Sequence, residues 1–138
     1  MIKAFNPNLF SELPLVGILR GFGTDSIEPL IGAAARGGLR NVEITMNTPD
    51  AGRQIRLAVE CARGMVNIGA GTVTSRRLLD EALAAGASFV VTPTLTLDVI
   101  DRCVALNLPV FPGALSPTEI ACAWEHGATM GKIFPAES

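Results

Sequence analysis

The sequence predicts an α/β protein of the (β/α)8 TIM-barrel type, with six βα units in its 138 residues. Short, nearly continuous apolar runs recur about every 20–26 residues, as in parallel strands that are covered on both faces. Segments with helical spacing lie between them, and repeated βα units imply right-handed crossovers. Polar residues stand at or near the carboxyl ends of the runs, the face where barrel enzymes carry their chemistry. These are Arg20, Glu43, Thr45, Thr72 and Thr92.

An open, doubly wound sheet is the alternative architecture. It gains no support as a dinucleotide-binding fold, because no G-x-G-x-x-G opens the first expected helix. The GAGT stretch at 69–72 has two glycines but follows the third run, and alone it is a weak signal for a phosphate loop. We therefore expect the barrel.

Six runs are expected as strands. Only two ionisable side chains, Glu43 and Lys132, stand inside them. The runs are LVGIL (15–19), NVEIT (41–45), VNIGAG (66–71), FVVTP (89–93), LPVFPG (108–113) and MGKIFP (130–135).

Helices are expected between the runs, and four of the five are followed by a glycine-containing turn. Ser75 is a plausible N-cap, and the stretch from Ser116 to Glu119 resembles a capping box. The expected helical segments are 26–39, 75–87, 95–108 and 116–128, with a further helix before Gly64.

The whole chain is expected to be one partial barrel domain, residues 1–138, without the last two βα units of the fold. Two more units would bring it to roughly 180–200 residues, within the lower range for this fold. Six strands of a closed barrel would expose two sheet edges. We expect either a truncated chain or a barrel whose closure something else supplies.

Composition excludes several classes of function. The net charge is -2 with no basic run, which argues against nucleic acid as a partner. No apolar stretch reaches the ~18 residues of a membrane span, and the first residues lack the features of a secretion signal. Three unpaired cysteines fit a reducing cytoplasm. The only histidine, His126, has no neighbouring metal ligands in the sequence, so no metal or cofactor is expected.

Lys132 and Glu43 are the strongest candidates for chemistry. An isolated charge inside a barrel is costly, so each must be paired, neutral or at a wet functional mouth. One interpretation is a buried Glu–Lys pair between the second and sixth strands. The other is an amine nucleophile that forms a Schiff base with a ketone, with Glu43 moving protons. Contact with Ile133 and Phe134 is expected to disfavour the charged ammonium.

Several motifs in order resemble the bacterial 2-keto-3-deoxy-6-phosphogluconate and 2-keto-3-deoxy-6-phosphogalactonate aldolases, from about residue 13 to the end. This resemblance implies a (β/α)8 barrel, usually a homotrimer, and a class I aldolase that needs no metal or cofactor. The motifs are GILRG (17–21), VEITMNTP (42–49), IGAGTV (68–73), VVTP (90–93), FPG (111–113) and GKIFPAE (131–137).

The resemblance also implies roles for four residues. Lys132 matches the Schiff-base lysine and Glu43 the general acid/base. Arg20 and Thr72 match positions that hold the polar groups of the substrate, although a surface salt bridge and an ordinary turn hydroxyl are the alternatives for them. The implied small-molecule partners are a phosphorylated 2-keto-3-deoxy sugar acid and pyruvate.

The galactonate branch is the favoured one. After the glutamate, members of the gluconate branch have a stretch similar to VTLRT, with an arginine at the position of Asn47 in this chain. The NTP stretch of this chain is instead similar to the NSP of the galactonate branch. A gluconate or a 4-hydroxy-2-oxoglutarate aldolase remains the alternative, and a non-catalytic barrel fragment is a third interpretation. The family's glycine-rich phosphate loops follow its seventh and eighth strands, beyond the six runs found here.

Overall fold

Six parallel strands form one sheet in which neighbours in sequence are neighbours in space, in the order β1 to β6. The computed structural model describes residues 4–136; Lys3 and the end of the GKIFPAE motif lie outside them. The number and order of the expected strands are confirmed, although most are shorter than their apolar runs. The strands are β1 (Gly17–Leu19), β2 (Asn41–Thr45), β3 (Asn67–Gly71), β4 (Val90–Thr92), β5 (Val110–Ala114) and β6 (Lys132–Ile133).

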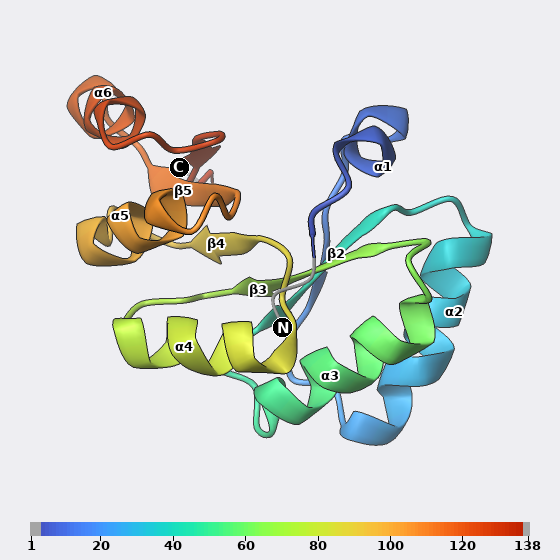
Figure 1. The fold of residues 1–138 in the computed structure, drawn as a ribbon. Coiled ribbons are helices and arrows are strands. Elements are labelled where there is room, and N and C mark those ends of the chain that lie inside the picture. The colour runs from blue at the N-terminus through green and yellow to red at the C-terminus, as the bar shows by residue number, and fades with distance from the viewer. Residues whose placement is uncertain (1–3, 137–138) are drawn as a thin grey trace.

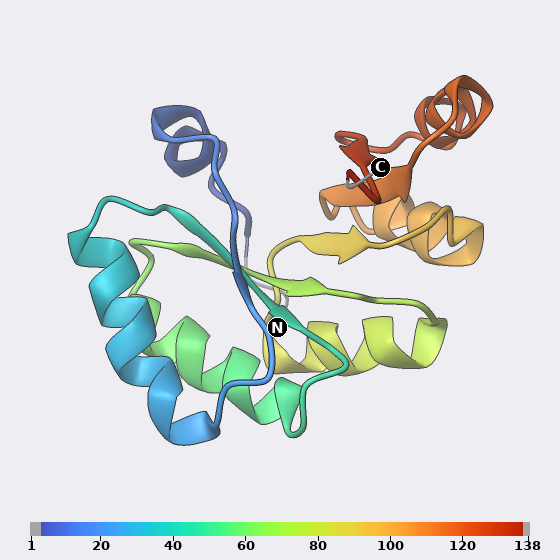
Figure 2. The same ribbon diagram turned by 180° about the vertical axis from the view of Figure 1, so that it is seen from behind.

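Helices connect consecutive strands. Figures 1 and 2 show α2, α3 and α4 on one side of the curled sheet and α1 on the other side. The expected caps are present, since Ser75 Oγ accepts the N–H of Leu78 and Ser116 forms a capping box with Glu119. The helical elements are α1 (Pro7–Glu12), the 3-10 turn η1 (Thr24–Ser26), α2 (Ile27–Arg36), α3 (Ala51–Ala62), α4 (Arg76–Ala85), α5 (Leu97–Ala105) and α6 (Pro117–Glu125).

Helix α1 is absent from the sequence-based expectations. It has only six residues, too few for an apolar period to be visible. Its signals are local: Asn6 is the N-cap, its side chain accepts the N–H of Asn8, and Pro7 occupies the first turn.

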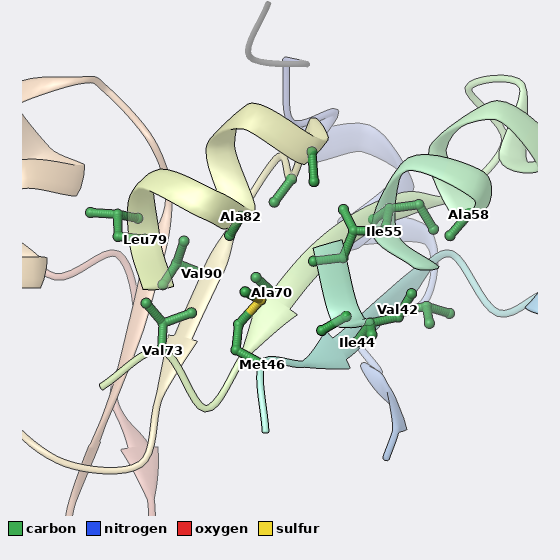
Figure 3. Packing of buried hydrophobic residues seen from close by; sticks show 14 of the residues in the cluster. Val42, Ile44, Met46, Ile55, Ala58, Ala70, Val73, Leu79, Ala82 and Val90 are labelled. Atoms are coloured by element: carbon green, nitrogen blue, oxygen red, sulfur yellow. The ribbon is translucent and has the colours of Figure 1, made fainter. Parts of the chain in front are cut away.

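The larger hydrophobic core lies between the sheet and the helices that cover it. Alternate strand residues such as Val42 and Ile44 of β2 contribute to it, and Ile55 of α3 packs there fully buried. Figure 3 shows these side chains between the strands and helices α3 and α4. Because side chains alternate along a strand, the intervening residues must point to the opposite, concave face.

A second, smaller cluster lies on that concave face. Phe89 and Phe111 stack with ring centroids 5.6 Å apart, and Phe5 and Phe10 from the N-terminal segment close over them at 5.8 and 6.0 Å. Aromatic pairs at such separations are favourable beyond the area that they bury. The N-terminal segment and α1 thus fill the inner face.

Three asparagines fasten the same segment to the amino-terminal ends of β2 and β3. Asn67 Nδ2 donates to Asn6 O and to Asn41 Oδ1, each at 2.9 Å, and Asn67 Oδ1 accepts the N–H of Asn6 at 2.9 Å. Asn41 Nδ2 in turn donates to the carbonyls of Leu13 and Leu15. Buried amides are stable only when their hydrogen bonds are made, so this network fixes where the N-terminal segment lies.

Strands β1 and β6 are the two edges of the sheet within residues 4–136. Apolar side chains are exposed along both, with Ile18 at 51 %, Ile133 at 56 % and Phe134 at 42 %. The six strands therefore form a curled partial barrel, and a closed eight-stranded barrel is not reached within the described residues.

None of the helices in the described part of the chain combines the length and apolar character that crossing a membrane requires.

Gly113 of β5 should be intolerant of any side chain. A Cβ there would overlap the carbonyl oxygen of Pro93, a backbone atom that a rotamer change cannot move. We expect Gly113→Ala to lower the free energy of unfolding by about 1–3 kcal/mol. Gly23→Ala is the matched control, because a Cβ there meets nothing within 4 Å and its φ is -74°. Urea unfolding of both variants checks this, and equal stability of the two would contradict it.

Candidate active site

The strand register places Glu43, Lys132 and Arg20 on the concave face. Glu43 lies between Val42 and Ile44, which both pack against the helices. Lys132 pairs with Gly113, two residues after the inward-facing Phe111. Paired residues point to the same face of a sheet, so Lys132 faces inward.

Arg20 follows β1 directly, two residues after Ile18, which pairs with Glu43. With a side-chain period of two, Arg20 continues the inward face of β1 toward the carboxyl end of the strands. The register and the side-chain period thus place these three charged residues on one face of the sheet.

Glu43 is 2 % exposed, the most deeply buried carboxylate of the site. A Cβ on Gly71 would lie 2.5 Å from Glu43 Oε1. The carboxylate therefore occupies the space that a side chain at position 71 would fill. Burial raises the pKa of Glu43, and the positive charges of Lys132 and Arg20 partly oppose that rise. A carboxyl group with a raised pKa can hold and release a proton nearer neutral pH, as a general acid/base must.

Lys132 is partly exposed at the edge of the sheet. Its Nζ lies 4.9 Å from the ring centroid of Phe134, within the range of a cation–π interaction. Ile133 and Phe134, the neighbours expected to desolvate this amine, are both exposed on the β6 edge.

A direct ion pair between Glu43 and Lys132 is not formed. The ion pairs of residues 4–136 that do not involve histidine are Arg40–Glu12 and Arg77–Glu81. The interpretation of Glu43 and Lys132 as a structural salt bridge between β2 and β6 therefore finds no support. His126, expected near a helix end, joins α6 to Asp101 of α5 at 2.7 Å.

Arg20 and Thr72 are in contact. Arg20 Nη2 donates to Thr72 Oγ1 at 3.3 Å, across 52 residues of sequence. Thr72 has φ of 55°, a left-handed conformation that is uncommon for a β-branched residue and is often found at functional sites. The exposed guanidinium and the hydroxyl together present donors that suit an anion or a sugar hydroxyl.

Two buried polar residues beside this site are missed by the sequence analysis. Thr48 is 6 % and Gln54 is 2 % exposed, and both bond to the backbone of the segment that follows Arg20. The available signal is the pair of glycines around Phe22, which indicates a loop that needs tethers.

No metal site accompanies these residues. In residues 4–136, no group of three or more His, Cys, Asp or Glu side chains is placed to hold a metal ion. Cys103 is buried in the core, and burial raises the pKa of its thiol to about 12, so it is not a nucleophile. The chemistry that the site can supply is amine and carboxyl chemistry from Lys132 and Glu43.

Known proteins match the chain over most of its length. The family model described as KDPG and KHG aldolase matches residues 7–138. The chain is 36 % identical to the 2-dehydro-3-deoxy-6-phosphogalactonate aldolase of Escherichia coli over 93 % of this chain and 62 % of that protein. It is 41 % identical to the 2-dehydro-3-deoxy-phosphogluconate aldolase of Pseudomonas aeruginosa over 91 % of this chain and 55 % of that protein.

A solved structure extends the comparison to the fold. The KDPG aldolase from Legionella pneumophila, crystallised with pyruvate captured as a covalent carbinolamine intermediate, superposes with a TM-score of 0.85 at 28 % identity. The match covers 96 % of this chain and 64 % of that one. The chain thus spans less than two thirds of the length of the relatives that it matches.

The raised pKa of Glu43 predicts a specific dependence of stability on pH. Ionising a buried carboxyl opposes folding. The stability that Glu43 contributes is therefore fully present below its ordinary pKa of 4.5, where it is protonated, and is lost as the pH rises through its raised pKa in the folded protein. We expect Glu43→Gln to be more stable than the parent protein at pH 7, with the gap shrinking toward pH 4. Urea unfolding across this range measures it.

Glu119 provides a control of opposite sign. Hydrogen bonds from the backbone N–H groups of Ser116 and Leu115 lower the pKa of Glu119, so its ionised form stabilises the fold above pH 4.5. Glu119→Gln should therefore be less stable than the parent protein at pH 7. A pH-independent gap for Glu43→Gln would contradict the assignment of a raised pKa.

Proposed function

The chain belongs to the KDPG and KHG aldolase family, and on that premise we propose that it acts as a class I aldolase. The proposed reaction cleaves 2-dehydro-3-deoxy-6-phosphogalactonate into pyruvate and glyceraldehyde 3-phosphate, within the degradation of sugar acids. The observation that carries the proposal is the placement of Lys132 and a buried, protonatable Glu43 on one concave face.

Lys132 would supply the covalent step. Its neutral amine attacks the C2 ketone, and loss of water gives an iminium ion. Glu43 removes the proton of the C4 hydroxyl, the C3–C4 bond breaks, and its electron pair flows into the iminium. The aldehyde leaves, and the remaining enamine takes a proton at C3. Hydrolysis then releases pyruvate and restores Lys132.

The partial exposure of Lys132 is consistent with access from solvent at the carboxyl end of the strands. The burial of Glu43 raises the pKa of its carboxyl, which favours the holding and release of a proton. Arg20 and Thr72 would hold the carboxylate or hydroxyls of the substrate, since a guanidinium matches a carboxylate with two parallel hydrogen bonds.

The preference for the galactonate over the gluconate epimer rests on the NTP stretch that contains Asn47, beside the mouth. A gluconate or 4-hydroxy-2-oxoglutarate aldolase is the second candidate, and the Pseudomonas relative with its gluconate name favours it. The substrates of the two branches differ in the configuration of one hydroxyl, which a single pocket hydrogen bond can distinguish.

We also propose that the six strands are part of a (β/α)8 barrel in one domain. The parallel order and the exposed apolar edges of β1 and β6 support this, because an uncovered sheet edge accepts further strands. A homotrimer in the cytoplasm is the accompanying proposal, to be tested by sedimentation. A partial barrel without catalytic activity is the alternative, which the shared concave face of Lys132 and Glu43 disfavours.

Lys132 should be trapped by pyruvate and borohydride. We expect one reduced adduct on the parent protein, located at Lys132 by peptide mass spectrometry, and none on Lys132→Met. Lys3, the only other lysine, is the internal control and should stay unmodified. Absence of any adduct in the parent protein would leave the non-catalytic alternative standing.

Cleavage rates should separate the substrate candidates. We expect the 6-phosphorylated galactonate substrate to give a higher kcat/KM than its gluconate epimer and than 4-hydroxy-2-oxoglutarate. Glu43→Gln should lower kcat about 10²–10⁴-fold, the usual contribution of a general acid/base. Equal rates with and without the 6-phosphate would point to the 4-hydroxy-2-oxoglutarate alternative.

A further inference from the structure

We propose that Thr48 and Gln54 are positioning residues that hold the Arg20–Gly23 segment, and through it the guanidinium of Arg20, over Thr72. The inference rests on the proposed function in giving Arg20 an anionic substrate to bind. Neither Thr48 nor Gln54 stands on an inner strand position, and neither is expected to touch substrate.

The Arg20–Gly23 segment has little packing to hold it. Its four residues are all exposed, and Gly21 has φ of 73°. Around both Gly21 and Gly23, no atom lies within 4 Å of the position that a Cβ would occupy. A loop with two glycines and no packing partners loses much conformational entropy when ordered, so hydrogen bonds must offset it.

Two such tethers come from the loop and helix that follow β2. The N–H of Gly21 donates to Thr48 Oγ1 at 3.0 Å, and Gln54 Nε2 donates to the carbonyl of Phe22 at 2.9 Å. The two side chains bind consecutive residues of the segment: Thr48 binds the N–H of Gly21, and Gln54 binds the C=O of Phe22. Arg20, the residue immediately before them, is thereby fixed in direction.

Both tethers are themselves anchored inside the protein. Thr48 Oγ1 lies 3.0 Å from Thr45 Oγ1, and Thr45 is fully buried at the end of β2, two residues after Glu43. Gln54 Nε2 also donates to the carbonyl of Pro49 at 3.1 Å. Hydrogen bonds therefore connect the Arg20–Gly23 segment to β2, the strand that carries Glu43.

This arrangement makes the position of Arg20 depend on β2 rather than on its own strand. Strand β1 is a sheet edge and contributes only three residues, whereas β2 is central and entirely buried. Tethering Arg20 to the rigid strand keeps a constant separation between its charge and the Glu43 carboxyl, which that charge influences. An anion held by Arg20 would then meet the carboxyl in a fixed geometry.

A mutant cycle with Arg20 tests this mechanism. Thr48→Val removes the hydroxyl with little change of shape, Thr48→Ser keeps it, and Arg20→Met removes the guanidinium. The first readout is the pKa of Glu43 from ¹³C NMR titration, which requires no turnover. Thr48→Val should raise it further, because the Arg20 charge moves away, while Thr48→Ser should match the parent protein. In the Arg20→Met background Thr48→Val should add nothing.

The second readout is the pyruvate concentration that half-saturates borohydride trapping. Thr48→Val should raise it about three- to tenfold, the effect expected of one hydrogen bond, with the maximal trapping rate changed less than about twofold. Thr129→Val is the matched control, because Thr129 Oγ1 also accepts a backbone N–H, that of Val110, at the other end of the sheet. It should change neither readout.

The outcomes separate the two proposals. An unchanged Glu43 pKa in Thr48→Val, or an equal effect with and without Arg20, would overturn the positioning role. If the parent protein traps no pyruvate, the proposed function fails, but the Glu43 titration still decides about the tethers. Should Thr48→Val fail to fold, Gln54→Met, which removes the second donor while keeping the side-chain length, decides the question by the same titration.

Discussion

The site depends on the alternation of side chains across a sheet whose two faces have different partners. On β2, Val42 and Ile44 pack against the helices, and this forces Glu43 to the concave side, where a carboxylate is costly. The charges of Lys132 and Arg20 partly offset that cost, and the glycines of β3 leave room for the side chain. Gly71 leaves room for the carboxylate, as Gly69 leaves room for the ring of Phe89. Without those two gaps, neither the acid nor the aromatic cluster below it would fit.

Much of this architecture is readable in the sequence. The apolar runs are long enough to predict all six strands, since a strand buried on both faces needs only a short uninterrupted stretch. The inward position of Glu43 and Lys132 follows from the cost of burying a charge, which must be paired, neutral or placed at a solvated mouth. The same reasoning fails for helix α1, whose six residues are held by Phe5 and Phe10 and by the Asn67 amide, contacts with residues far along the chain.

Other features depend on three-dimensional context that no local pattern contains. Gln54 lies on a helix whose neighbours Arg53 and Arg56 are exposed, so nothing in the sequence distinguishes it from a surface residue. The glycines of the GAGT stretch look like a weak phosphate loop, but Gly69 and Gly71 serve packing within β3. The exposure of Ile133 and Phe134 beside Lys132 follows from the edge position of β6 within residues 4–136, which is a property of the sheet rather than of the strand.

The closure of the inner face by the N-terminal segment has a consequence for the order of events during synthesis. Phe5 and Phe10 are synthesised before their partners Phe89 and Phe111, which follow about 80 to 100 residues later. At roughly 5–20 residues per second, these rings stay without their native contacts for several seconds or more. The nascent chain therefore carries an unpaired aromatic segment while β1 to β4 are synthesised, and the inner face is completed only after β5.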